Sequence, residues 1–349
     1  MHLELVVPAL LPVQELPLAA APALEMLLAR ARRTNGRPAN LETWLCRGFG
    51  LCDPSTDNPA IPAGALTAHA YGLEPGGLEP GGLAPRAHLW LRADPVHLRA
   101  DRDRVLLVPS QAFALTAAEA QGLAASLAPL LAGKFVLHVV TPDQWCLQAE
   151  AQVQGEFSAQ PPIDLAGADV DPHLPPKQWH PLLTELQMAL YDHPANTARE
   201  QRGEPVVNSV WLWGAGKLPS AASGPWQSVS ATDPLALGLA RLAGTRHRST
   251  GAGAIEWLER APEDGRHLLV LDDLRGVQAM GDQDALGRRL MDLEANWFAP
   301  LLAALKAGRI GMLTIHAPDA AASFETTRAD LRRFWRRPRP LKDYAGTAA

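Results

Sequence analysis

The chain has 349 residues and a formal net charge of −5. Its length supports one or two domains, and 47% hydrophobic with 20% charged residues is typical of a soluble globular protein. This weak charge excludes a global field for nucleic acid or anionic lipid. Three cysteines are too few for a disulfide framework and predict a cytoplasmic protein. No stretch reaches the roughly 20 apolar residues of a membrane span, so we expect no membrane partner.

The first part of the chain predicts a strand, two helices and a connector. A short apolar run predicts a buried strand over residues 3–7, and apolar residues at helical spacing predict helices over 23–33 and 41–49. Residues 53–65 are rich in Pro and Asp and predict a loop. Residues 72–85 repeat the string GLEPG and predict a flexible connector, because the repeat has no apolar face to bury.

Residues 86–160 have the pattern of a small α+β lobe. Strands are predicted over 88–93, 105–108, 135–140 and 145–149, around a helix over 116–131. That helix begins at a capping box formed by Thr116 and Glu119. Strands grouped around one helix predict a mainly antiparallel sheet.

The remaining sequence alternates between helix and strand patterns. Helices are predicted over 176–191, 235–242, 253–260 and 286–305, and strands over 206–213, 267–271 and 311–315. Such alternation predicts a mainly parallel sheet flanked by helices. We expect the N-terminal strand to join this sheet. Residues 1–85 and 161–349 would then form one α/β core, with the lobe of residues 86–160 inserted into it.

One segment carries a resemblance to a known family. Residues 193–219 read HPANTAREQRGEPVVNSVWLWGAGKLP. This string resembles the H-P-x-N-x-x-R, A-N and R-G-A-G stretches of archaeal-type cofactor-independent phosphoglycerate mutases. Through residues 90–98, 187–188 and 208–214, the chain also resembles bacterial RpfE-type regulatory proteins over nearly its whole length. The resemblance implies an alkaline-phosphatase-like α/β fold with an inserted lobe.

The same segment supplies the candidates for ligand binding. These are His193, Asn196, Arg199, Asn208, Gly214 and Gly216. The first three recur every three residues and would share a helical face, while the glycines end a strand, where a backbone can approach a substrate. Two interpretations are open. These residues bind a small phosphorylated or anionic ligand, or the asparagines satisfy backbone groups and the glycines serve packing.

The resemblance implies two divalent metals and a serine nucleophile, and the chain departs from this pattern. The first strand runs into Pro8 where the family has an Asp–Gly pair. Residues 64–69 read GALTAH where the family reads G-S-D-T-A-H, which places Ala65 at the nucleophile position. A methyl group cannot attack phosphorus.

The weak metal candidates are Asp272, Asp273 and His316. The family's His is missing after the two aspartates, Arg275 would repel a metal, and the Asp that precedes the family's last His is absent before His316. Three ligands are too few for a dinuclear site. Another interpretation is that Asp272 and Asp273 cap the turn that follows them.

The sequence therefore predicts a mutase-like protein without metal ligands or nucleophile, and thus a non-catalytic regulatory or ligand-binding protein. We expect a small phosphorylated or anionic ligand, or a protein partner, and no cofactor. The alternative is an active mutase or phosphatase that binds Mn or Zn through diverged ligands. A third interpretation is a structural or interaction protein in which side chains fill the cleft that holds the active site in the mutase family.

Other signals are weaker. The chain has no G-x-S-x-G string and no Walker A string. Residues 328–342 are basic, with Phe334 and Trp335 among the arginines. This segment would suit phosphate-bearing partners, or it is a solvated face that docks through its aromatic residues. Because the whole chain is acidic and contains no recognisable binding module, we expect no nucleic-acid partner.

Overall fold

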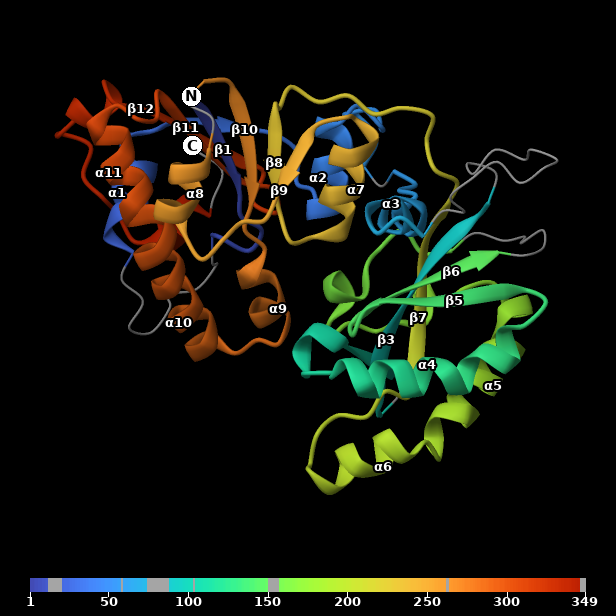
Figure 1. Ribbon diagram of the computed structural model, residues 1–349. Helices are drawn as coiled ribbons and strands as arrows, with labels where there is room; N and C mark the ends of the chain where they lie inside the picture. The colour runs from blue at the N-terminus through green and yellow to red at the C-terminus, as the bar shows by residue number, and fades with distance from the viewer. Residues whose placement is uncertain are drawn as a thin grey trace. The chain divides into compact units, whose positions relative to one another are not determined.

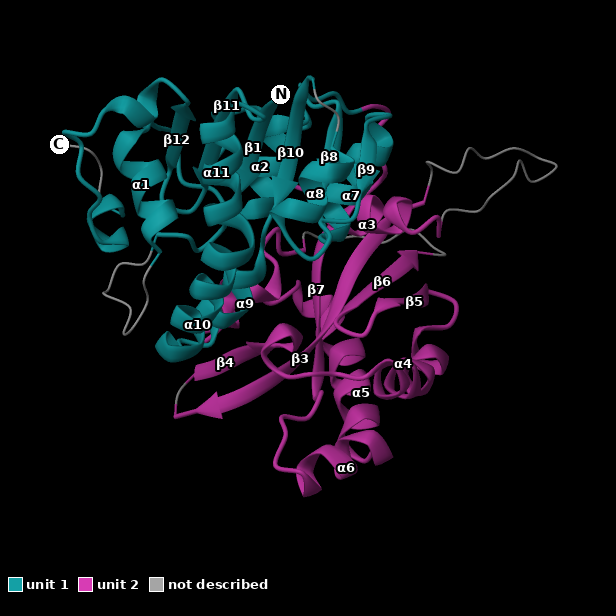
Figure 2. Cartoon of the chain, turned by 60° about the vertical axis from the view of Figure 1, so that its left-hand side comes forward, with its two compact units in different colours: residues 1–57, 222–349 teal, residues 58–221 magenta. Residues whose placement is uncertain are grey.

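The computed structural model describes residues 1–11, 21–57, 59–73, 88–102, 104–149, 157–261 and 264–345. The chain forms two compact units, coloured separately in Figure 2: residues 1–57 with 222–349, and residues 58–221. Both units are mixed α/β, which confirms the predicted class in its broad sense. Most of the connector predicted over 72–85 lies outside the described residues. No helix in the described ranges has both the length and the hydrophobicity to cross a bilayer.

The first unit is built on a sheet whose seven described strands have the order β2-β12-β11-β1-β10-β8-β9 (Figure 1). In chain order they are β1 (His2–Val6), β2 (Arg32–Asn35), β8 (Ser228–Ser230), β9 (Arg246–Arg248), β10 (Arg266–Val270), β11 (Met312–Ala317) and β12 (Ala322–Thr327). Strands β11, β1, β10, β8 and β9 are parallel, and β12 and β2 continue the sheet antiparallel. The predicted joining of the N-terminal strand to the late strands is confirmed.

Seven helices of this unit lie within the described residues. They are α1 (Pro22–Arg30), α2 (Leu41–Gly48), α7 (Pro234–Leu242), α8 (Ala254–Arg260), α9 (Asp273–Ala279), α10 (Gln283–Leu293) and α11 (Ala299–Ala307). The helix predicted over 286–305 is interrupted by a π-helical turn at Glu294–Phe298. There the buried Glu294 carboxylate accepts hydrogen bonds from the N–H groups of Ala23 (2.7 Å) and Leu24 (3.1 Å). Glu294 thus caps α1, whose own N-cap residue supplies no side-chain bond.

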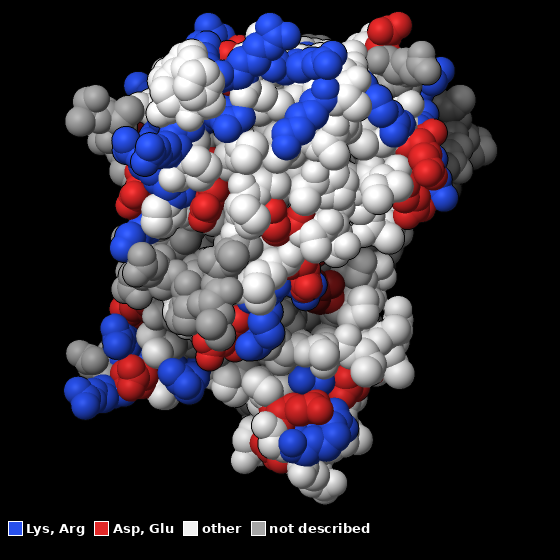
Figure 3. Space-filling view, turned by 90° about the vertical axis from the view of Figure 1, so that its left-hand side faces the viewer, with Lys and Arg blue, Asp and Glu red and all other residues white. Residues whose placement is uncertain are grey.

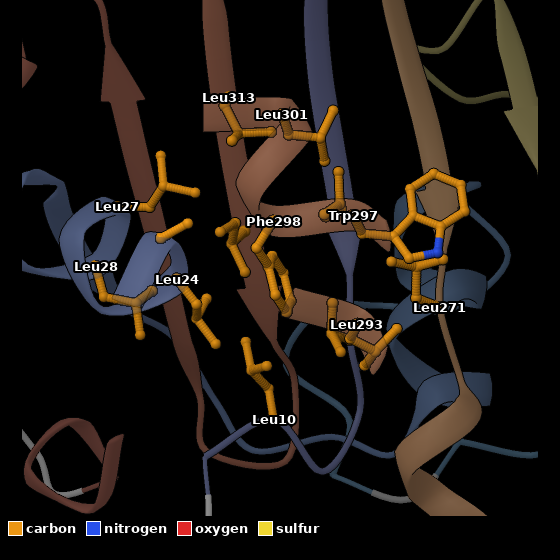
Figure 4. Packing of buried hydrophobic residues seen from close by; sticks show 14 of the residues in the cluster. Leu10, Leu24, Leu27, Leu28, Leu271, Leu293, Trp297, Phe298, Leu301 and Leu313 are labelled. Atoms are coloured by element: carbon orange, nitrogen blue, oxygen red, sulfur yellow. The ribbon is translucent and has the colours of Figure 1, made fainter. Parts of the chain in front are cut away.

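A hydrophobic core fills the space between the sheet and the helices that include α1 and α11. Figure 4 shows Leu24, Leu27 and Leu28 of α1 near Phe298 and Leu313. The Phe298 side chain is completely buried. Packing of this kind fixes the sheet whose strand ends carry the metal candidates.

Replacing Phe298 with Ala tests this core. We expect the free energy of unfolding to fall by about 3–5 kcal/mol, because the substitution removes a buried ring and leaves a cavity. Urea denaturation followed by circular dichroism measures the change. Phe334, which is 78% exposed, provides the matched control, and its replacement by Ala should shift stability by less than about 0.5 kcal/mol. Equal losses of stability in the two variants would contradict the placement of Phe298 in the core.

The second unit holds an antiparallel sheet of five described strands. They are β3 (Trp90–Asp101), β4 (Arg104–Pro109), β5 (Phe135–Thr141), β6 (Gln144–Ala149) and β7 (Ser209–Gly216). Its described helices are α3 (Ala63–Ala70), α4 (Ala117–Leu131), α5 (His180–Tyr191) and α6 (Pro194–Gln201). The antiparallel sheet and the capping box at the start of α4 match the predicted lobe.

This unit extends beyond the lobe predicted over 86–160. Strand β7, predicted among the strands of the parallel core, instead pairs antiparallel with β3, from Trp90 opposite Gly216 to Val96 opposite Ser209. Helix α3 begins inside the predicted loop, and α5 and α6 complete the unit. The predicted boundary is wrong because pairing with distant strands, and not the local sequence, decides which sheet an apolar run such as β7 joins.

Candidate functional site

The candidate residues fall into two groups, one in each unit. Asp272, Asp273 and His316 belong to the first unit. Ala65, His193, Asn196, Arg199, Asn208, Gly214 and Gly216 belong to the second unit.

The metal candidates lie at the carboxyl edge of the parallel strands. His316 of β11 is opposite Val6 of β1, and Val7 N–H donates to the His316 carbonyl (2.9 Å). Asp272 follows β10, the strand on the other side of β1. The structure therefore places Asp272 and His316 on either side of the end of β1, the edge where ligands bind in open α/β sheets.

The His316 ring is held by one hydrogen bond and by two further contacts. Its Nδ1 lies 2.8 Å from the Ser323 hydroxyl, its Nε2 lies 3.4 Å from Glu4 Oε2 without a hydrogen bond, and the Trp44 ring lies at a tilt of 50° with its centroid 4.9 Å away. Burial favours a raised pKa for Glu4, but contacts with His316 and Arg266 outweigh it and lower the pKa to about 2. Glu4 is thus a buried carboxylate that the sequence analysis missed. The sequence feature that could have indicated it is a charged residue inside an otherwise apolar predicted strand.

The two aspartates have different environments. Asp272 is half-buried, and burial raises its pKa, while Thr232 Oγ1 lies 3.5 Å from its carboxylate. Asp273 is exposed in the first turn of α9. Asp272 occupies the N-cap position of α9, yet its side chain makes no capping bond, and its backbone carbonyl accepts from Arg275 N–H (3.1 Å). The predicted side-chain cap by Asp272 is therefore wrong.

A bidentate ion pair occupies the turn that begins at Asp272. Both terminal nitrogens of Arg275 lie 2.8 Å from the carboxylate oxygens of Glu42 on α2, and both side chains are largely buried. Fork geometry makes this one of the stronger forms of charge-assisted hydrogen bonding. Within the ranges that the structure describes, no cluster of three or more His, Cys, Asp or Glu side chains could hold a metal ion.

The two asparagines of the second unit bind backbone groups. Asn196 donates to the carbonyls of Leu190 and Val207 (both 2.7 Å) and accepts from Val207 N–H (2.9 Å). Asn208 accepts from Leu98 N–H (2.7 Å) and donates to the Leu98 carbonyl (2.8 Å). Both amides therefore join chain segments within this unit, as the packing interpretation expected.

Arg199 is fully buried and joins α6 to the start of α4. It donates to the backbone carbonyls of Pro205 (2.7 Å) and Ala114 (2.9 Å) and to Glu119 Oε2 (3.2 Å). Burial favours a raised pKa for Glu119, but hydrogen bonds from Thr116 and the nearby arginines outweigh it and lower the pKa to about 2. The guanidinium thus has a structural role in linking two helices.

His193 is the N-cap residue of α6. Its Nδ1 accepts a hydrogen bond from Ala195 N–H (3.2 Å), which satisfies a donor in the first turn of the helix. The side chain is half-buried. Ligand binding by His193 and by the other candidates of this unit stays a prediction.

The glycines allow α3 to pack closely against the sheet. A Cβ atom on Gly214 would lie 2.6 Å from Ala63 Cβ, and one on Gly216 would lie 2.5 Å from Pro62 Cβ. A Cβ on Gly64 would lie 2.6 Å from the Leu91 backbone. These are closer than van der Waals contact permits, so the positions require glycine. Ala65, the next residue of α3, is 1% exposed.

Replacing Gly214 with Ala tests this packing. Gly214 has a φ of +59°, so the variant combines backbone strain with a steric clash against Ala63. We expect a loss of stability of about 2–4 kcal/mol, measured by thermal or urea unfolding. Gly203 also has a positive φ, of +70°, but open space around it. Its replacement by Ala should cost about 1–2 kcal/mol from strain alone, and a cost equal to that of Gly214 would contradict the packing role.

Replacing Glu119 with Gln tests the link between α4 and α6. The variant removes the nearer and more buried of the two carboxylates that contact the buried Arg199, so we expect about 2–3 kcal/mol lower stability at pH 7. Because the folded pKa of about 2 is below the ordinary value of 4.5, this stabilisation is complete above pH 4.5 and is lost as the pH falls toward 2. Urea unfolding of both proteins between pH 7 and pH 3 should therefore show converging stabilities.

The matched control for this link is Glu204→Gln. Glu204 also contacts Arg199 and Arg202, but its side chain is 40% exposed. Its replacement should cost less than about 1 kcal/mol at pH 7. A pH-independent loss in the Glu119 variant would show that the capping geometry, and not the charge, carries the effect.

The geometry defines a two-unit mixed α/β protein with a polar edge on a mainly parallel sheet. No known family profile matches the chain. A stretch of 67 residues is 40% identical to a probable 2,3-bisphosphoglycerate-independent phosphoglycerate mutase of Geobacter sulfurreducens, and covers 18% of this chain and 17% of that protein. A stretch of 68 residues is 34% identical to such a mutase of Methanosarcina mazei, with the same coverage.

The fold is similar to that of a solved archaeal protein over almost the whole chain. The PH0037 protein of Pyrococcus horikoshii matches with a TM-score of 0.50 and 15% identity, over 93% of this chain and 87% of that protein. The chain is thus related in sequence to cofactor-independent phosphoglycerate mutases, through a segment shorter than a fifth of their length. The relation to RpfE-type regulatory proteins stays a prediction.

Proposed function

We propose that this chain is a phosphoglycerate-mutase-like protein with an alkaline-phosphatase-like core that does not transfer phosphoryl groups. It acts instead as a regulatory or ligand-binding protein. The observation that supports this most is the Arg275–Glu42 ion pair at the carboxyl edge of the sheet. The resemblance expects metal ligands at this edge, and a guanidinium stands there instead.

Electrostatics argue against two divalent cations at this edge. A dinuclear site needs several carboxylates and imidazoles to offset the charge of the metals. Here the carboxylate of Glu42 already pairs with Arg275, and His316 contacts Glu4 and Ser323. Asp272 and Asp273 would then have to hold the cations with Arg275 in the same turn, and its charge adds repulsion.

The nucleophile position supports the same proposal. Ala65 is buried on α3, and Leu66, which stands for the family's metal-binding Asp, is fully buried. Neither side chain carries an oxygen. A phosphoryl group would therefore have no serine to accept it at this place.

The partner in this proposal is a small phosphorylated or anionic ligand, or another protein. Lys and Arg side chains gather across the upper part of the face in Figure 3. In the C-terminal segment, Phe334 and Trp335 are 78% and 66% exposed beside exposed arginines such as Arg336 and Arg337. Exposed aromatic residues among positive charges support contact with an anionic partner.

Metal content and mutase activity test the proposal together. After incubation with MnCl₂ and dialysis, we expect well below one metal ion per chain by mass spectrometry. We also expect no conversion of 3-phosphoglycerate to 2-phosphoglycerate in an enolase-coupled assay with added Mn²⁺. The physical reason is the lack of a ligand set that could retain two cations.

The variant Ala65→Ser provides the matched control. It restores the hydroxyl without adding ligands, so it should stay inactive and should not become phosphorylated. Stoichiometric metal with turnover by the unaltered protein would establish the alternative, an active enzyme with diverged ligands. Activity gained by Ala65→Ser alone would show that the metals are present and that only the nucleophile was lost.

A further inference from the structure

Ser228 and His267 form a hydrogen-bonded pair in the first unit, apart from the candidates above. They lie opposite each other on the parallel strands β8 and β10, with Ser228 Oγ 2.8 Å from His267 Nδ1. The other ring nitrogen, Nε2, lies 2.8 Å from the backbone carbonyl of Asp264. Serine, imidazole and an orienting oxygen thus follow one another at hydrogen-bond distance.

These distances fix the direction of the hydrogen bonds. A carbonyl oxygen only accepts, so Nε2 of His267 carries the hydrogen and donates it to Asp264. In the neutral ring Nδ1 is then an acceptor, and the Ser228 hydroxyl donates to it. Burial lowers the pKa of His267, which favours the neutral ring near pH 7. The imidazole therefore has the tautomer of a general base directed at a serine hydroxyl.

A cavity of about 390 Å³ reaches Ser228 of this pair. It is lined by Ser228 of β8, by Arg248 of β9 and the three residues that follow it, by Glu256, Trp257 and Arg260 of α8, and by Ala261. Glu256 is paired with Arg260 (2.7 Å), which leaves Arg248 as the cavity's cation without a carboxylate partner among the lining residues. Trp257 is fixed by a hydrogen bond from its Nε1 to Ser230 Oγ (2.9 Å). Arg248 donates to the Arg260 backbone carbonyl, which holds the guanidinium at the cavity wall. The cavity is large enough for a small organic molecule.

We propose that Ser228 and His267 form a serine hydrolase site, which takes small esters with a negatively charged acyl group into this cavity. The features that carry the proposal are the Ser–His–carbonyl geometry, the adjoining cavity and the positive charge of Arg248. Such sites are recognised by geometry and roles, so the lack of a G-x-S-x-G string does not decide the matter. The proposal needs no metal and uses none of the residues on which the proposed function rests.

The reaction proceeds by acyl transfer. Ser228 Oγ forms a bond to the ester carbonyl carbon while its proton passes to His267 Nδ1. The bond from that carbon to the alkoxy oxygen then breaks, the leaving alkoxide takes the proton from Nδ1, and the acyl group stays on Ser228. Water, deprotonated by the same nitrogen, attacks the acyl carbon, releases the carboxylic acid and restores the serine hydroxyl. Arg248 supplies positive charge for the substrate's carboxylate.

The first unit contains a second serine–histidine pair that lacks this cavity. Ser323 Oγ lies 2.8 Å from His316 Nδ1, so the distance alone does not distinguish the two serines. Ser323 is not among the residues that line this cavity. Reactivity at Ser228 and not at Ser323 therefore follows from the cavity.

Labelling with a fluorophosphonate probe tests the site on the full chain in EDTA. We expect covalent phosphonylation of Ser228, located by peptide mass spectrometry, and its loss in Ser228→Ala. His267→Asn can still accept a hydrogen bond from Ser228 but has no basic nitrogen, so we expect labelling to fall at least about 100-fold. Ser323→Ala is the matched control, because Ser323 also hydrogen-bonds a histidine but does not line this cavity. It should label like the unaltered protein.

Substrate preference gives a second readout. We expect faster hydrolysis of mono-p-nitrophenyl succinate than of the neutral p-nitrophenyl butyrate, and a loss of about ten-fold or more of this preference in Arg248→Gln. Circular dichroism and melting curves show whether each variant is folded. Labelling at Ser323 or elsewhere, no labelling at Ser228, or equal hydrolysis by folded Ser228→Ala would overturn the proposal. Mutase activity tests the proposed function separately and has no bearing on this outcome.

Discussion

Strand β1 determines the arrangement of the first unit, because it lies between β10 and β11 and pairs with both along its full length. Its apolar residues Leu3, Leu5 and Val6 are fully buried, and each contributes about 1.5–3 kcal/mol by the usual estimate for such side chains. Through this pairing, the first residues of the chain hold together strands that lie more than 260 positions later. The polar edge depends on it, since Asp272 and His316 flank the end of β1.

Local signals in the sequence predicted the elements that depend on local interactions. Strand β1, helix α2 and the capping box of Thr116 with Glu119 have apolar runs or caps within a few residues of one another. Strands β8 and β9 are three residues long and polar, so their sequence carries no periodic signal. The partner of β7 and the contact of Ser228 with His267 depend on strand register, which sequence spacing does not contain.

The sequence shows which residues stand at the candidate positions, but it does not show what their side chains contact. The lack of a serine at Ala65 is visible in the sequence, because it concerns which residue is present. The ion pair between Glu42 and Arg275 joins positions 233 apart, and Glu4 meets His316 across two strands. Only the fold shows that charges at this edge are paired with one another. The same applies to Asn196, Asn208 and Arg199, whose polar atoms bind backbone groups of their own unit.

The close approach of α3 to its sheet has a consequence for how such chains diverge. Gly64, Gly214 and Gly216 leave no room for a Cβ atom, so a lineage that keeps this helix in place must retain them, whether or not it turns over a substrate. Glycines at such positions can therefore be retained for packing in a protein that does not catalyse a reaction. In this chain the packing of α3 accounts for the three glycines, so their presence does not by itself indicate a reaction.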